Sequence, residues 1–146
     1  MNEAVQKYID EHLEETIGDL KRLTAQPSIS AQRLGVKECA EMVVAELRAA
    51  GFTAETVPTA DPDYPGIIAE TDGDADYTLL FYNHYDVQPA DPLDEWETPP
   101  FEPTERDGYI YGRGISDDKG PIIARLAAIK ALRAARGSLP IKIKWL

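Results

Sequence analysis

Two short segments of the chain carry residue types that could hold a metal ion. Residues 83–86 read Asn-His-Tyr-Asp, and residues 112–120 read Gly-Arg-Gly-Ile-Ser-Asp-Asp-Lys-Gly. Imidazole nitrogens and carboxylate oxygens are common protein ligands of zinc. No His follows His84, and no Asp or Glu follows Asp118. The two segments therefore predict part of a metal site, with its remaining ligands lying elsewhere.

The first segment places His84 and Asp86 one residue apart, directly after the apolar run at 78–82. In an extended segment such residues point to the same face. Asp86 can then accept a hydrogen bond from one imidazole nitrogen and leave the other nitrogen for a metal. Taken alone the pattern is weak, because a single histidine at a strand end is more often structural or simply exposed.

The second segment combines three glycines with two adjacent acids, Asp117 and Asp118. Its glycine spacing does not match a dinucleotide-binding turn, and no Ser or Thr follows Lys119 as a phosphate-binding loop requires. Two carboxylates near a helix start favour a cation site, with Asp117 free to bridge two metal ions. The alternative is a glycine turn in which Asp118 caps the N-terminus of a helix.

The elements that must position these residues follow from apolar periodicity and from Gly and Pro positions. We predict helices over residues 2–26, 35–50 and from Pro121 to Gly137, strands over 52–57, 66–70, 78–82, 109–111 and 139–146, and an irregular loop over 89–108. The continuous apolar run at 78–82 is typical of a strand buried on both faces. The alternation predicts an α/β fold, a three-layer αβα sandwich with a mostly parallel sheet, in which ligands bind at the carboxyl ends of strands.

The composition limits the classes of function. The 146 residues fit one domain, 43% of them are hydrophobic, and the net charge is -11. An acidic chain is a poor partner for nucleic acid, which binds clusters of Lys and Arg. No run of 18 apolar residues and no signal-peptide pattern occurs, so we expect no membrane association and a cytoplasmic location. The single cysteine, Cys39, is expected to be a buried core residue.

The charge is unevenly distributed. Residues 1–118 hold all 26 acidic side chains and 8 basic ones, whereas residues 119–146 hold 7 basic and no acidic side chains. We expect the acids that compensate this basic end to lie outside the chain.

Three motifs together resemble the dinuclear-zinc exopeptidase and amidohydrolase family, which includes carboxypeptidase G, aminoacylase, acetylornithine deacetylase and carnosinase-type dipeptidases. The motifs are Asn83–Pro89, Trp96–Phe101 and Gly112–Pro121. The Val-Gln-Pro extension and the Trp…Pro-Pro-Phe loop are most similar to the dipeptidase branch. The resemblance covers nearly the whole chain and implies that residues 1–146 are the N-terminal part of a zinc-peptidase catalytic domain, without its lid domain.

The resemblance implies a role for each matching residue. His84 would bind one zinc ion, Asp86 would orient His84, and Asp117 would bridge two zinc ions, with cobalt or manganese as alternatives. The peptide after the bridging aspartate, Asp117–Asp118, would be cis. The implied reaction is attack of a metal-activated water on a peptide or amide bond of a small peptide or N-acyl amino acid. The intact protein is also expected to form a homodimer.

The same resemblance places the general base, a Glu-Glu pair, and the remaining ligands beyond Leu146. Two protein ligands hold zinc weakly, because zinc sites use at least three protein donors. We therefore expect the chain to be catalytically silent by itself. Because the apolar strand that ends at Leu146 would lack neighbours and covering helices, we also expect the chain to aggregate or require a partner. The alternative function is that of an inactive truncated or split fragment acting with a separate C-terminal piece.

Overall fold

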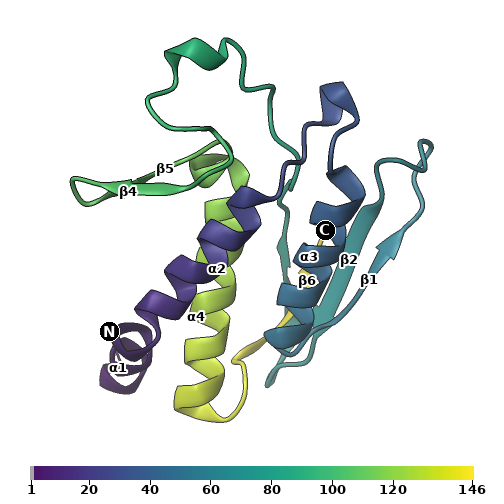
Figure 1. Cartoon of the computed structure of the whole chain (residues 1–146). Coiled ribbons are helices and arrows are strands. Elements are labelled where there is room, and N and C mark those ends of the chain that lie inside the picture. The colour runs from purple at the N-terminus through teal and green to yellow at the C-terminus, as the bar shows by residue number, and fades with distance from the viewer. Residues whose placement is uncertain (1) are drawn as a thin grey trace.

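The computed structural model describes residues 2–146 and places the helices against one face of a four-stranded sheet, with a two-stranded hairpin beside them (Figure 1). The helices are α1 (Glu3–Glu11), α2 (Leu13–Ala25), α3 (Val36–Ala49) and α4 (Gly120–Arg136). The strands are β1 (Thr53–Val57), β2 (Gly66–Thr71), β3 (Ala75–Phe81), β4 (Thr104–Arg106), β5 (Tyr109–Tyr111) and β6 (Ile141–Trp145). Short turns lie at η1 (Ser30–Gln32), η2 (Leu93–Glu95) and η3 (Ile115–Lys119).

Helices α3 and α4 form where the apolar periodicity predicts them. The apolar stripe of α3 is buried, including Cys39, which is 0% exposed. Gly51 and Gly137 follow the two helices with φ values of 86° and 79°, a left-handed conformation that glycine adopts without a steric penalty. None of the helices in residues 2–146 combines the length and apolarity that crossing a membrane requires.

The single N-terminal helix predicted over residues 2–26 is in fact two helices that meet at His12. His12 has φ -115° and ψ 13°, outside the helical range, and it separates α1 from α2. Its imidazole Nδ1 lies 2.8 Å from the Tyr8 carbonyl oxygen, and its ring stacks on the Tyr8 ring with centroids 3.9 Å apart. The side chain thus binds the backbone of the preceding turn, where the helix breaks. His12 is half-buried and has no part in the site described below.

The α/β class is confirmed, but the sheet is mixed where a mostly parallel one was expected. The strand order is β1-β2-β6-β3. β3 and β6 are parallel because the long connection between them includes α4, whereas β1 pairs antiparallel with β2, and β2 pairs antiparallel with β6. The carboxyl ends of β3 and β6 meet at one edge of the sheet, and the first metal-site segment leaves β3 there.

Only one face of the sheet carries helices in the described part of the chain, so the three-layer arrangement is observed as two layers. The core lies between that face and helices α3 and α4, and Trp145 at its centre is 2% exposed. On the opposite face Ile68 is 38% exposed and Leu80 is 56% exposed. The prediction of a strand buried on both faces was therefore wrong for β3, which is an edge strand with one open face.

Part of the basic C-terminal segment pairs with acids of earlier elements, which corrects the expectation that these acids lie outside the chain. The ion pairs are Lys130–Asp19 at 3.7 Å, Arg136–Asp74 at 3.9 Å and Lys144–Glu70 at 3.9 Å. They form because α4 packs beside the N-terminal helices and β6 lies between β2 and β3.

Candidate metal centre

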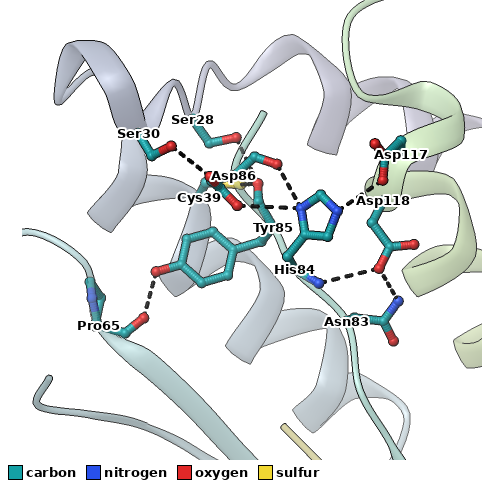
Figure 2. A network of polar contacts seen from close by, with 10 residues as sticks. All are labelled: Ser28, Ser30, Cys39, Pro65, Asn83, His84, Tyr85, Asp86, Asp117 and Asp118. Atoms are coloured by element: carbon teal, nitrogen blue, oxygen red, sulfur yellow. Dashed lines mark hydrogen bonds and ion pairs between the residues drawn. The ribbon is translucent and has the colours of Figure 1, made fainter. Parts of the chain in front are cut away.

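The structure brings His84 and Asp117 together from two distant segments. His84 lies just beyond the end of β3, and Asp117 lies in η3, immediately before α4. The His84 ring nitrogen Nε2 is 2.8 Å from the Asp117 carboxylate oxygen Oδ1 (Figure 2). The Asp117 side chain is 86% exposed, so this end of the pair is open to solvent. An imidazole nitrogen and a carboxylate therefore converge at an accessible point, as the sequence predicts.

Asp86 holds the other side of the His84 ring. His84 Nδ1 lies 3.0 Å from the Asp86 backbone carbonyl oxygen and 3.3 Å from its carboxylate Oδ1. The closer contact is therefore to the backbone, with the predicted carboxylate contact beside it. A carbonyl can only accept, so Nδ1 carries the hydrogen and Nε2 is the nitrogen available to a metal. The Asp86 carboxylate is itself fixed by the Ser30 hydroxyl, which donates to Oδ2 at 2.6 Å.

The surroundings of His84 change its affinity for a proton. Burial by itself lowers the pKa of His84, but hydrogen bonds to the Asp117 carboxylate and the Asp86 carbonyl outweigh burial, and the pKa is raised above its ordinary value. Both ring nitrogens face oxygen acceptors, which is the arrangement that favours a cation at this position. A metal at Nε2 would take the place of the proton there.

Asp118 does not cap α4, which removes the alternative in which this acid serves a helix N-terminus. No side chain caps α4. The Asp118 Oδ2 atom instead accepts from the Asn83 side-chain amide at 2.5 Å and from the His84 backbone N–H at 3.2 Å. The two acids therefore contact different parts of His84: Asp117 contacts its imidazole ring, and Asp118 contacts its backbone N–H. The peptide between them is cis, as expected.

Close packing explains the glycines of the second segment without any phosphate. Gly114 has φ 85°, and a Cβ atom there would lie 2.5 Å from Val87 Cγ1. A Cβ atom on Gly120 would lie 2.1 Å from the Ile115 carbonyl oxygen. Both approaches are closer than any side chain allows, so Gly114 lets the turn pack against Val87 after β3, and Gly120 lets η3 close on its own first residue, Ile115. This packing is what carries Asp117 to His84.

Lys119 is a structural anchor of the site that the sequence interpretation missed. Its side chain is 0% exposed, and its ammonium donates to the carbonyl oxygens of Leu23 at 3.0 Å and Gln26 at 2.6 Å. Burial lowers the pKa of the Lys119 ammonium. The bonds tie η3 to the C-terminus of α2. A lysine directly before the apolar residues Gly120–Ala124 was the available signal.

Two cavities include His84 in their lining. One, of about 620 Å³, is lined by Trp96, Tyr111 and Asp117 in addition to His84 and Asp86. The other, of about 460 Å³, is mostly apolar and is lined by Tyr85, Ile122 and Trp145 among others. The candidate centre therefore borders open space, and the cavity of about 620 Å³ also includes Asp117 in its lining.

The donor set fits a divalent metal in chemistry but is incomplete in number. Among residues 2–146, no cluster of three or more His, Cys, Asp or Glu side chains could hold a metal ion. His84 and Asp117 supply two donors, whereas a zinc site uses at least three protein donors. The geometry is that of a partial site.

Comparisons with known proteins find similarity to a family of peptidases. The model of Peptidase family M20/M25/M40 matches residues 80–146. The human Beta-Ala-His dipeptidase is 39% identical over 159 residues, which cover 99% of this chain and 31% of that protein. The succinyl-diaminopimelate desuccinylase of Bordetella petrii is 38% identical over 116 residues, which cover 80% of this chain and 29% of that protein.

The fold is shared as well. The crystal structure of Sso-CP2, an M20 family metallo-carboxypeptidase from Sulfolobus solfataricus, superposes with a TM-score of 0.84 at 39% identity, covering 90% of this chain and 30% of that one. The chain thus spans about 30% of the length of each of these relatives.

Proposed function

The chain belongs to the M20 family of metallopeptidases, and on that premise we propose that it supplies part of a metal centre that hydrolyses peptide or amide bonds in small substrates. The observation that carries the proposal is the 2.8 Å approach of His84 Nε2 to Asp117 Oδ1, with Nδ1 held by Asp86. One nitrogen of the ring is fixed and the other is presented to solvent beside a carboxylate. That is the arrangement of a histidine that serves as a metal ligand.

Each of three residues has its own task in this proposal. His84 holds the metal through Nε2, and Asp86 keeps the ring in the required tautomer and orientation. Asp117 is exposed enough to reach a second ion as well as the first, so we assign it the bridging position. Bound zinc ions would supply the Lewis acidity that polarises the scissile carbonyl and activates water, and cobalt or manganese would serve similarly.

The substrate class follows from the kinds of relative that the chain matches. Those relatives are named as a Beta-Ala-His dipeptidase, a succinyl-diaminopimelate desuccinylase and a metallo-carboxypeptidase. We propose dipeptides and small N-acyl amino acids as substrates, bound in the cavities that flank His84. The cavity that contains Trp96 and Tyr111 offers aromatic surface to an apolar or aromatic side chain.

A second candidate function is that of a fragment that is inactive alone and acts with a separate polypeptide. The observation that favours it is the number of donors, since residues 2–146 provide only two donors at the site. In this reading the chain binds a divalent metal weakly and turns over no substrate until a partner supplies further ligands and a general base.

The test is metal binding followed at the histidine rings. The chain has two histidines, so the ¹⁵N spectrum of the imidazoles contains one reporter at the site, His84, and one control, His12. We expect Zn²⁺ to shift the His84 signals and leave those of His12 unchanged, and Asp117→Asn to weaken that response. A wild-type chain whose His84 signals do not move at millimolar Zn²⁺ would contradict the metal site. Hydrolysis of dipeptides by the chain, abolished by a chelator, would decide for the enzyme over the inactive fragment.

A further inference from the structure

Arg125 on α4 contacts three consecutive residues at the end of β3. Its guanidinium lies over the Phe81 ring, 5.2 Å from the centroid. Its Nη1 atom donates to the Tyr82 carbonyl oxygen at 3.2 Å and to the Asn83 side-chain oxygen Oδ1. A planar guanidinium suits this combination, because it stacks on an aromatic ring and donates from its edge at the same time. The result is a fixed orientation for the carboxamide of Asn83.

The Asn83 carboxamide passes this orientation on to the site. Because Oδ1 faces Arg125, the amide nitrogen Nδ2 faces Asp118 and donates to its Oδ2 atom at 2.5 Å. The same Oδ2 atom accepts from the backbone N–H of His84 at 3.2 Å. Figure 2 shows the Asp118 carboxylate between Asn83 and the His84 backbone, on the side of the imidazole away from Asp86. A continuous series of hydrogen bonds thus connects α4 with the backbone of His84.

We propose that Asn83, oriented by Arg125, is a positioning residue of the metal centre: through Asp118 it sets the separation of His84 from Asp117. Asp118 is covalently next to Asp117 and is hydrogen-bonded to the residue before His84 and to His84 itself. Any shift of the Asn83 carboxamide therefore changes the spacing of the two donors. This inference rests on the proposed function, because positioning matters only if His84 and Asp117 hold a metal.

The alternative is that the series only stabilises the end of β3. Two contacts of Arg125, the Phe81 ring and the Tyr82 carbonyl, would persist without the Asn83 side chain. Strand-end stability and donor spacing can therefore be separated by substitution. Asn83→Leu keeps the approximate size and removes both side-chain hydrogen bonds. Arg125→Met removes the donor at the far end, and Arg125→Lys keeps a cation there.

The experiment measures Zn²⁺ affinity at His84 by imidazole ¹⁵N NMR, with His12 as the internal control, and the melting temperature of each variant without metal. Arg136→Met is the matched control. Arg136 is an exposed arginine at the other end of α4 from the site, and it forms a long ion pair of 3.9 Å with Asp74. We expect the dissociation constant at His84 to rise about 10- to 100-fold in Asn83→Leu, the range seen when groups that orient a metal ligand are removed. The dissociation constant should also rise in Arg125→Met. In Arg125→Lys it should lie between the values of Arg125→Met and the wild type, and in Arg136→Met it should equal that of the wild type.

Unchanged affinity in folded Asn83→Leu, or an equal loss in Arg136→Met, would overturn the positioning role while leaving the metal site intact. Failure of the wild-type chain itself to bind Zn²⁺ at His84 would overturn both the site and this inference. If Asn83→Leu does not fold, the smaller Asn83→Ala decides on the same criteria. If Asn83→Leu melts at a lower temperature but binds Zn²⁺ with wild-type affinity, the hydrogen bonds from Arg125 to His84 serve only the stability of the end of β3.

Discussion

At the scale of single residues, the least expected feature is the fully buried ammonium of Lys119. Burying a cation is costly unless it is hydrogen-bonded, and Lys119 binds the carbonyl oxygens of Leu23 and Gln26 at the C-terminus of α2. That end of a helix carries partial negative charge, which further favours a cation. The lysine beside the acids of η3 is thus part of what holds that turn in place.

Replacement of this lysine by methionine tests its structural weight. We expect Lys119→Met to lower the free energy of unfolding by about 1–3 kcal/mol, because two carbonyl groups lose a charged donor in a buried place. Urea unfolding measures the change. The control is Lys130→Met on α4, where a 3.7 Å ion pair to Asp19 predicts a change of less than about 1 kcal/mol. A Lys119→Met chain as stable as the wild type would show that burial of the charge costs as much as its hydrogen bonds contribute.

Asp63 predicts a pH dependence of stability away from the site. Hydrogen bonds from Lys37 and Arg33 hold the pKa of the Asp63 carboxyl below its ordinary value. The Asp63 carboxyl therefore binds a proton more readily in the unfolded chain than in the folded one. Its ion pairs stabilise the fold fully above the pKa of the unfolded state, and this stabilisation is lost as the pH falls through the pKa of the folded state. We expect Asp63→Asn to lower the melting temperature slightly at pH 7, because the groups are exposed, and by less at pH 2, where protonation of the carboxyl weakens the ion pairs. An equal difference at both pH values would contradict the assignment to ion pairing.

At the scale of elements, the turn η3 depends on a close backbone contact at the start of α4. A Cβ atom on Gly120 would lie 2.1 Å from the Ile115 carbonyl oxygen, so the backbone must move to admit any side chain. We expect Gly120→Ala to destabilise the chain by about 1–3 kcal/mol, the usual cost of overpacking. Gly18→Ala is the matched control, because that exposed position within α2 has nothing within 4 Å. It should gain about 0.5–1 kcal/mol, so thermal or urea unfolding should give opposite signs.

The elements also show what the sequence could and could not predict. Periodicity located α3, α4 and most strands, since local apolar spacing decides helix or strand. It could not reveal that α1 and α2 part at His12, which depends on one side chain binding the preceding turn. Periodicity also predicted that β3 is buried on both faces. That prediction was wrong because a continuous apolar run does not reveal which elements cover the strand. Burial of a strand is set by distant segments of the chain.

The same distinction applies to the site. His84 and Asp117 were found because each follows a recognisable local signal, a strand end or a glycine turn. Asn83 lies in the first of these segments but was given no role, and Arg125 was not singled out, because the contact between them spans 42 positions in the sequence. Nothing near Arg125 in sequence marks it as different from the other basic residues of α4. Residues that position a ligand become visible only once the fold is known.

At the scale of the whole molecule, one face of the sheet and the edge formed by β3 are open in the described chain. β3 is an edge strand, and Leu80 on it is 56% exposed, beside Ile68 at 38% and the Glu70–Lys144 ion pair. Unpaired backbone groups along an edge strand, together with exposed apolar side chains, promote association between chains. The net charge of -11 opposes this association at low ionic strength.

We therefore expect the chain to self-associate in a concentration-dependent manner, and more strongly as salt screens its charge. Leu80→Lys should shift sedimentation velocity profiles toward the monomer, because it places a charge on the open face next to the edge. Leu93→Lys is the matched control, since Leu93 is 61% exposed in η2, away from the sheet. If Leu93→Lys had the same effect, added charge rather than the sheet face would be the cause. A wild-type chain that stays monomeric at every concentration and salt would mean that the Glu70–Lys144 pair and the surrounding polar side chains are enough to keep this face apart from a second copy.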